Sequence, residues 1–356
     1  MSPNAITARP DTIDAPLYVV TSVINPCRYR SRWALWHDFA RRITDAGARL
    51  LTVEVAYGER EHAIGLDAPG EHVKLRTRHE LWHKENALNI GFSRLPPDWK
   101  YAAWVDADIT FARPDIVEAT IHRLQHHPIA QMWTSAFDLG PGGEPFAKYG
   151  SFAARYVESH VAPLGAKQSG SKPLGVKPSG GYGDGPSAAR KSYWHSGYAW
   201  AIRRDAFDAI GGLLDFAVLG AADYFMAWAL VGRLSERIYC QLEDDARATR
   251  GYSPGYVERL VDWERRALSL RKNLGVVGGT VLHHWHGKKR QRGYNRRENV
   301  LIDNQYDPRR DLQRDWQGLW QLTDDGADRS VRLREQIRAY FASRDEDSID
   351  FDVKAS

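Results

Sequence analysis

The hydrophobic positions in the first half of the chain alternate between the spacing of strands and the spacing of helices. A continuous apolar run at 17–23 predicts a buried strand, and Ser31 is then the predicted N-cap of an amphipathic helix that ends at Gly47. The same pattern predicts strands at 50–55, 73–75 and 101–105, and helices at 79–92 and from Pro114 onward. This alternation predicts an α/β fold with an open sheet.

The pattern changes in the second half. Periodicity fades over 140–189, and residues 165–185 are mostly Gly, Ser, Lys and Pro, a composition that cannot pack a core. This segment is either a plain linker or a lid that closes over substrate, and the sequence leaves both open. Order returns at Tyr193, after which we predict helices near 203–209, 222–231 and 257–268 and a last strand at 276–282.

Composition narrows the class of protein. Of the 356 residues, 43% are apolar and 26% charged, which is typical of a soluble globular protein and excludes wholesale disorder. Cys27 and Cys240 are too few for a disulfide framework, so a reducing compartment is the simpler expectation. The first sixteen residues lack an apolar core, and no later run approaches the roughly 18 apolar residues of a membrane span. We therefore expect a cytoplasmic protein without a membrane span.

Positive charge is unevenly distributed. The formal net charge is only +4, yet one short segment contains Lys288, Lys289, Arg290, Arg292, Arg296 and Arg297. Such a run either faces phosphate or forms a solvated basic surface, and both interpretations remain open.

Two acidic residues directly follow the strand predicted at 101–105. Asp106 and Asp108 are thereby placed at the carboxyl end of a strand, the edge where open α/β sheets bind ligands. A hard divalent cation prefers oxygen ligands, and it can neutralise a leaving diphosphate by bridging both phosphates. One carboxylate would bind the metal and the other would lie near a ribose or a metal-bound water. A solvated acidic turn is the alternative.

Three histidines follow the last predicted strand, namely His283, His284 and His286. Imidazole beside carboxylate suits a borderline cation such as Mn²⁺ better than Mg²⁺, so one histidine could complete the metal site. Spacing does not settle which one binds. If the segment remains extended, His284 and His286 lie on the same side and His283 on the other. A lone histidine is more often a structural residue.

Asp223 is the candidate for a catalytic base. An acceptor hydroxyl must lose its proton as it attacks an anomeric carbon, and a carboxylate can accept that proton. Asp223 follows the small residues Gly220, Ala221 and Ala222, which allow close approach, and it begins an otherwise apolar helix. It can equally be the N-cap of that helix, and both roles can hold at once.

Taken in order, these motifs resemble the GT-A-type, family-2-like glycosyltransferases. The first block is 84–89 with the Asp-x-Asp segment 104–109. The second runs from 195–204 through Gly211-Gly212 to Asp223 and is similar to the acceptor-side block of galactosyltransferases and polypeptide N-acetylgalactosaminyltransferases. The third is the 284–286 region followed by Arg292, Tyr294 and Arg297. Together they cover most of residues 17–300.

The resemblance implies a GT-A, Rossmann-like α/β fold with a mixed central sheet and a C-terminal helical extension. It implies an N-terminal tail (1–16), a catalytic domain (17–300) and the extension (301–356). Within the domain we expect a nucleotide-sugar-binding half (17–135), a flexible insertion or lid (136–192), and an acceptor half with the C-terminal metal ligand (193–300).

The resemblance also implies a nucleotide-diphosphate sugar donor, first of all a UDP-sugar, with Mn²⁺ or Mg²⁺, and an inverting transfer to a hydroxyl acceptor with Asp223 as base. Expected donor contacts are Thr21, Ser22, Arg28, Glu54, Lys84 and Asp106. Expected metal ligands are Asp106, Asp108, His284 and His286. Trp194, Tyr198 and Trp200 are candidates for a sugar-stacking surface, although aromatic residues at alternate positions are more often core.

Three other interpretations compete. The acceptor is a glycan or small molecule in the main interpretation, whereas the basic run would also suit a hydroxymethylated base in DNA, as in phage enzymes, after the base is exposed or flipped. A metal-dependent hydrolase could use the same Asp and His ligands, but it leaves the acceptor-like block unexplained. A catalytically silent sugar-binding module is the third, because fold alone does not establish activity.

Overall fold

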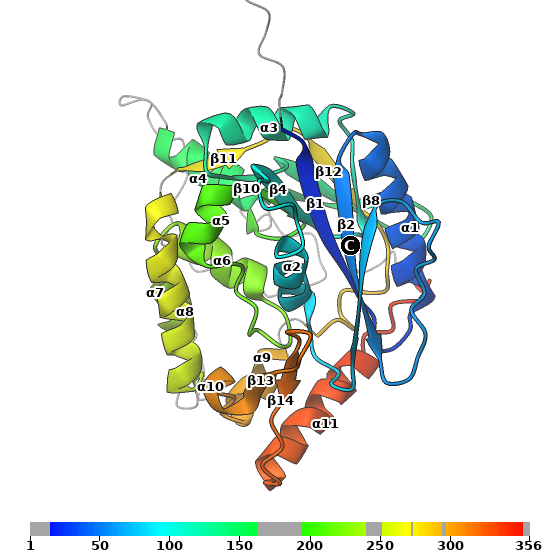
Figure 1. Ribbon diagram of the computed structural model, residues 1–356, viewed down its shortest axis with the longest axis vertical. Coiled ribbons are helices and arrows are strands. Elements are labelled where there is room, and N and C mark those ends of the chain that lie inside the picture. The colour runs from blue at the N-terminus through cyan, green and yellow to red at the C-terminus, as the bar shows by residue number, and fades with distance from the viewer. Residues whose placement is uncertain (1–14, 162–193, 240–250, 272, 294–296, 352–356) are drawn as a thin grey trace, which may run out of the picture.

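The computed structural model describes residues 15–161, 194–239, 251–271, 273–293 and 297–351. Segment 165–185, for which a linker or a lid was considered, lies outside these ranges. Within them the chain forms an α/β fold around a seven-stranded sheet (Figure 1). The strands, in their order across the sheet, are β11 (Leu274–Val276), β6 (Ile129–Gln131), β10 (Ala199–Arg203), β4 (Tyr101–Val105), β1 (Leu17–Ile24), β2 (Arg49–Tyr57) and β3 (Glu71–Thr77).

The central sheet is mixed, as expected for the fold class. Strands β4, β1, β2 and β3 run parallel to one another, whereas β10 runs antiparallel to both β4 and β6. The carboxyl ends of β1 to β4 therefore meet at one edge, where the connecting segments can bring polar side chains together.

Helices cover both faces of this sheet because successive strand side chains point to opposite faces. Val19 of β1 packs in a core with α1 (Arg30–Asp45) and α3 (Ile116–His126). The next residue, Val20, packs in the core of the other face. The helices of that second face are α2 (Lys84–Phe92), α4 (Phe152–Val161), α5 (Arg204–Ile210), α6 (Ala222–Leu230), α7 (Leu234–Tyr239) and α8 (Pro254–Ala267), which continues into a 3₁₀ turn, Leu268–Leu270.

A second, five-stranded sheet begins directly after β4. Its order is β5 (Ile109–Phe111), β12 (Thr280–His283), β7 (Ser135–Leu139), β8 (Pro145–Ser151) and β9 (Trp194–His195). The single strand predicted at 276–282 is wrong, because the chain leaves β11 at Val276 and enters this second sheet at Thr280. Gly279 has φ of +147° between the two strands, a conformation that side chains rarely adopt.

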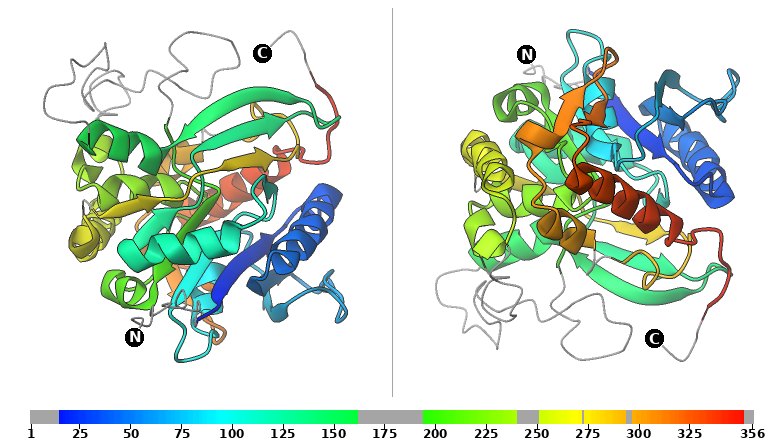
Figure 2. Two further views of the ribbon diagram at one scale, coloured as in Figure 1. Left: turned by 90° about the horizontal axis from the view of Figure 1, so that it is seen from above. Right: turned by 90° about the horizontal axis from the view of Figure 1, so that it is seen from below.

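The C-terminal part packs on the same core as α2 and α8. It comprises α9 (Arg297–Asp303), α10 (Pro308–Asp311), the hairpin strands β13 (Leu312–Arg314) and β14 (Trp320–Leu322), and α11 (Asp328–Ala342). Phe341 of α11 stacks on Trp82 with ring centroids 6.3 Å apart. After α11 the chain returns along the second sheet, where Phe351 packs on Phe146 of β8 (Figure 2). No helix in the described ranges is long and apolar enough to cross a membrane.

Two predicted helix starts differ from the structure. The cap of α1 is not Ser31, because the carboxylate of Asp347 accepts the backbone N–H groups of Arg30 and Ser31, both at 2.8 Å. Helix α2 begins at Lys84 and not at residue 79, because Trp82 N donates to Val218 O and holds the preceding residues in a turn.

Candidate active site

The second sheet assembles a cluster of one carboxylate and two imidazoles. Asp108 lies just before β5, and His283 ends β12, which pairs with β5 so that His283 lies opposite Ile109. The chain then turns, so His286 points back to the same place. Ligand atoms of Asp108, His283 and His286 all lie within 4.8 Å of one another, and all three side chains are buried.

The hydrogen bonds of His283 leave a nitrogen lone pair facing this cluster. His283 Nδ1 lies 2.7 Å from Asp138 Oδ1 on the neighbouring strand β7. Burial alone would raise the pKa of Asp138, but Lys289 and His283 hold it well below its usual range, so the carboxylate accepts and Nδ1 carries the proton. In neutral imidazole, Nε2 is then an acceptor, and a carboxylate–histidine pair of this kind commonly orients a metal ligand.

His286 Nε2 lies 3.2 Å from His283 Nε2 and 3.1 Å from Asp108 Oδ2. Burial, with the charges of Arg292 and Arg32, lowers the pKa of His286 to about 4, so the ring is neutral at pH 7. Its other nitrogen, Nδ1, is 3.8 Å from Glu346 Oε2, so the ring can carry its proton there and present Nε2 to the cluster. Two nitrogens and one carboxylate oxygen thus converge.

The donor set fits a divalent cation. Asp108 Oδ1 is buried and accepts no hydrogen bond from the part of the chain that the structure describes. Burial would raise the pKa of Asp108, but His286, His283 and Arg32 hold it well below its usual range, so the carboxylate is charged. One charged oxygen ligand with two imidazoles suits Mn²⁺ or another borderline cation better than Mg²⁺.

Arg32 and Glu346 surround the cluster from distant parts of the sequence. Arg32 on α1 lies 3.5 Å from Asp108 Oδ2, and its Nη2 donates to Glu346 Oε1 at 2.8 Å. Glu346 is buried, and although burial would raise its pKa, Arg32 and Arg344 hold it well below the usual range. These two residues, like Asp138, escaped sequence reasoning because each is an ordinary charged residue with no local motif.

Two of the predicted metal ligands lie outside the cluster. His284 Nε2 is 2.8 Å from Thr110 Oγ1, on the other side of the turn, because the segment after β12 does not remain extended. Asp106 instead pairs with Lys84, the first residue of α2. Burial would lower the pKa of Lys84, but Asp106, Glu85 and Asp223 raise it, so Lys84 is a cation at the sheet edge.

Asp223 lies in the first turn of α6 and is not its N-cap, which is Ala221 with φ of +74°. Ser196 Oγ donates to Asp223 Oδ2 at 3.4 Å. A Cβ at Gly197 would come within 2.7 Å of the same oxygen, so glycine there allows the close approach. The charge of Asp223 acts to raise the pKa of both Lys84 and Asp106, so its carboxylate interacts electrostatically with the Lys84–Asp106 pair.

The residues predicted for nucleotide contact are divided between packing and surface positions. Thr21 is buried and donates to Val105 O, and Glu54 lies within β2, where it accepts the N–H groups of Ala63 and Ile64. Ser22 is half-buried in β1, and Arg28 is exposed beside Trp33 in the turn after β1. Thr21 and Glu54 therefore have structural partners.

A cavity of about 410 Å³ lies where β2 and β3 end, on the same sheet edge as Asp106. Its lining residues are Tyr57, Gly58, Glu59, Arg60, Arg78 and Glu80. Sequence reasoning missed them because it ended the second strand at residue 55, whereas β2 continues to Tyr57.

The aromatic residues predicted to bind an acceptor lie mostly in the core. Trp200 is buried against Trp104, with ring centroids 6.4 Å apart, and donates to Ser196 O. Tyr198 is buried, stacks on His195 and donates to Asp138. Trp194 lies in β9, and its side chain is outside the described residues.

The basic run does not form one phosphate-facing surface. Lys289 is half-buried, pairs with Asp138 and lies 3.0 Å from Tyr149 Oη. Arg292 is also buried and donates to Gly287 O at 3.2 Å. Lys288 and Arg290 remain nearer the surface, and Arg296 lies outside the described residues.

Comparisons with known proteins give remote structural matches. No family model and no curated protein matches the chain. The catalytic domain of Drosophila β1,4-galactosyltransferase 7, solved with xylobiose, is 11% identical over 60% of this chain and 59% of its own, with a TM-score of 0.29. A mutant of that enzyme in complex with manganese, UDP-Gal and xylobiose matches at 10% identity over 60% of each chain, with a TM-score of 0.30. A nucleotide-diphospho-sugar transferase from Desulfovibrio desulfuricans is 11% identical over 92% of this chain and 97% of its own, with a TM-score of 0.29.

Proposed function

We propose that this protein is a metal-dependent glycosyltransferase that moves a sugar from a nucleotide-diphosphate sugar to a hydroxyl acceptor. The observation that carries the proposal is the cluster of Asp108, His283 and His286, which follows the Lys84-paired Asp106 by two residues. The carboxylate of Asp223, which accepts from Ser196, acts electrostatically on that Lys84–Asp106 pair. Transfer from a nucleotide sugar needs these three elements: a cation site for the diphosphate, a second positive group, and a base.

Asp108, His283 and His286 would hold the cation, with Mn²⁺ preferred over Mg²⁺. When bound, the cation neutralises the diphosphate as the bond between sugar and phosphate breaks. Lys84, kept protonated by its three neighbouring carboxylates, adds positive charge on the same side, and Asp106 fixes its position. The cavity at the ends of β2 and β3 offers space for the nucleoside, flanked by Arg60 and Arg78.

Asp223 would act as the base. Its carboxylate takes the proton of the acceptor hydroxyl, the hydroxyl oxygen bonds to the anomeric carbon, and the electron pair of the broken bond leaves with the diphosphate. Attack from the face opposite the leaving group inverts the anomeric configuration. NMR of the product tests this point, since an inverting enzyme gives the anomer opposite to that of the donor.

The acceptor we propose is a glycan or small molecule. In the DNA interpretation, the basic run supplies phosphate contacts, but Lys289 is half-buried and paired with Asp138, and Arg292 is buried and donates to Gly287 O. Salt-sensitive binding to duplex DNA at roughly 50 mM salt, lost on replacing Lys288 and Arg290, would favour DNA instead.

The test of the proposed function is a panel of nucleotide sugars with and without Mn²⁺, followed by thermal unfolding and by release of nucleoside diphosphate. One donor should raise the midpoint temperature of unfolding only when Mn²⁺ is present, because ligand binding to the native state adds RT ln(1 + [L]/Kd) to the free energy of unfolding. Diphosphate release without any acceptor-dependent increase would indicate a hydrolase. If no nucleotide sugar stabilises the protein, the proposal fails.

A further inference from the structure

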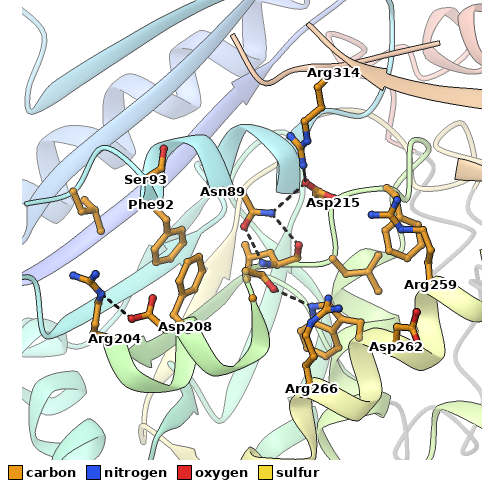
Figure 3. A pocket seen from close by; sticks show the side chains of 18 of the residues that line it. Asn89, Phe92, Ser93, Arg204, Asp208, Asp215, Arg259, Asp262, Arg266 and Arg314 are labelled. Carbon is orange, nitrogen blue, oxygen red and sulfur yellow. Dashed lines mark hydrogen bonds and ion pairs between the residues drawn. The ribbon is translucent and has the colours of Figure 1, made fainter. Parts of the chain in front are cut away.

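A large pocket lies at the end of α2 remote from the candidate active site. Its volume is about 790 Å³, and α2, α5, α8 and the β13 strand contribute to its walls (Figure 3). Lys84 at the start of α2 pairs with Asp106, whereas Phe92 at the end of the same helix lines the pocket. The eight steps from Lys84 to Phe92, at about 1.5 Å each, put about 12 Å of helix between them, so the two sites are separate.

Charged side chains dominate the pocket, and most of them are paired. Arg204 bonds to Asp208 at 3.0 Å, as Figure 3 shows, and Arg314 bonds to the buried Asp215 at 2.7 Å. Asp262 pairs with Arg265, which lies outside the pocket. The carboxylates of the wall are therefore already satisfied.

Two arginines of the wall have no such partner. Arg259 and Arg266 form no ion pair with any residue in the described ranges, and Arg259 forms no hydrogen bond with them either. Arg259 lies over the rings of Phe216 and Trp320, at 4.9 and 5.9 Å, which fixes the guanidinium plane and leaves its N–H edge available. Arg266 donates Nε to Ile210 O at 2.7 Å and keeps its terminal nitrogens for a ligand.

The two arginines are spaced for a ligand larger than a single ion. They lie seven residues apart on α8, which is two turns, so both project from one face about 10 Å apart along the axis. A guanidinium presents a rigid fork of donors that matches phosphate or carboxylate, and holding it in place by stacking reduces the entropy lost on binding. The pocket volume is in the range of small-molecule sites.

We propose that this pocket binds an organic anion with two phosphate or carboxylate groups, one at Arg259 and one at Arg266. The site goes beyond the proposed transfer reaction and needs neither the donor nor the metal.

Calorimetric titration of metal-free full-length protein at constant ionic strength tests the proposal with two probes, fructose 1,6-bisphosphate and adipate. At least one probe should bind with a Kd below about 1 mM. Binding of the bisphosphate alone identifies a phosphate ligand, and binding of adipate alone identifies a carboxylate ligand. Absence of binding by both probes overturns the proposal.

Variants assign the binding to this pocket. R259Q combined with R266Q should weaken it at least about tenfold, whereas R41Q, which changes an exposed arginine of α1 outside the pocket, should leave it unchanged. Equal affinity of R259Q/R266Q and the unmodified protein overturns the assignment. If the double variant unfolds at a lower temperature, R259Q alone carries the test, because Arg259 forms no hydrogen bond with the described residues.

Discussion

At the scale of single residues, the turn after β12 decides which histidines meet Asp108. A chain that stayed extended would pair His284 with His286, but the turn brings His283 and His286 together and leaves His284 against Thr110. His283→Ala should therefore weaken Mn²⁺ binding at least about tenfold, measured by electron paramagnetic resonance of the free ion. His284→Ala is the matched control and should change the affinity little. If His284→Ala weakened Mn²⁺ binding more than His283→Ala did, the proposed set of metal ligands would be wrong.

Asp223 is expected to act on transfer and not on binding. Asp223→Asn keeps the shape of the side chain but removes the proton acceptor, so transfer should fall by roughly 10² or more. Donor and Mn²⁺ affinities should stay unchanged, because Asp223 lies outside the cation cluster. Normal transfer by this variant would place the base elsewhere.

Glu85, next to Lys84, should make stability depend on pH. Burial raises the pKa of Glu85 from 4.5 to about 7, despite the opposing charge of Lys84. The folded state then holds this proton more tightly than the unfolded state, so the contribution to stability is present below pH 4.5 and is lost as pH rises to 7. Urea unfolding at both ends of this range should show the unmodified protein losing up to about 3 kcal/mol relative to Glu85→Gln. A difference between the two proteins that is independent of pH would argue against a titrating Glu85.

Sequence reasoning proposed Asp108, His286 and Asp223 because each follows a recognisable strand or begins a helix, and the structure brings the first two together with His283. It could not identify Asp138, Lys289 or Glu346, whose places depend on strand pairing and on the return of the C-terminal segment. It also proposed Glu54 as a nucleotide contact, whereas the structure shows this residue buried with its carboxylate accepting two backbone N–H groups.

At the scale of elements, the spacing of apolar residues predicted the strands and helices of the first half closely. The errors lie at the ends of elements and in the connections between them. The boundary between β11 and β12 was missed because both strands are largely apolar and only Val277, Gly278 and Gly279 separate them. The start of α1 was misassigned because its cap, Asp347, lies more than 300 positions away. Such contacts have no local signature.

The cap of α1 gives a stability prediction. Asp347→Ala removes the acceptor of two N–H groups and should lower the free energy of unfolding by about 1 kcal/mol in urea denaturation. Asp350→Ala is the control, because Asp350 is 79% exposed and only faces Lys288 at 3.9 Å, an arrangement that contributes little. If both variants lost the same free energy of unfolding, the Asp347 cap would make no specific contribution to stability.

At the scale of the whole molecule, two sheets meet where β4 ends, and the proposed cation site lies at that junction. Binding there requires groups from β5, the end of β12 and the turn after it, all in their native places. Mn²⁺ should therefore slow unfolding and leave the refolding rate nearly unchanged, because a site assembled late contributes little to the transition state. Stopped-flow measurements in urea with and without Mn²⁺ check this, and faster refolding would indicate an early site.

The pairing of Arg32 with Glu346 has a consequence for biosynthesis. These residues are 314 positions apart, and a ribosome adds roughly 5 to 20 residues per second, so Glu346 is synthesised many seconds after Arg32. During that interval the nascent chain first contains Asp108 without His283 and His286. Later it contains all three residues but not yet Glu346. The complete site can exist only once residues near 346 have left the exit tunnel, so the order of translation keeps the cation from being captured in its final surroundings until that segment has been synthesised and released from the tunnel.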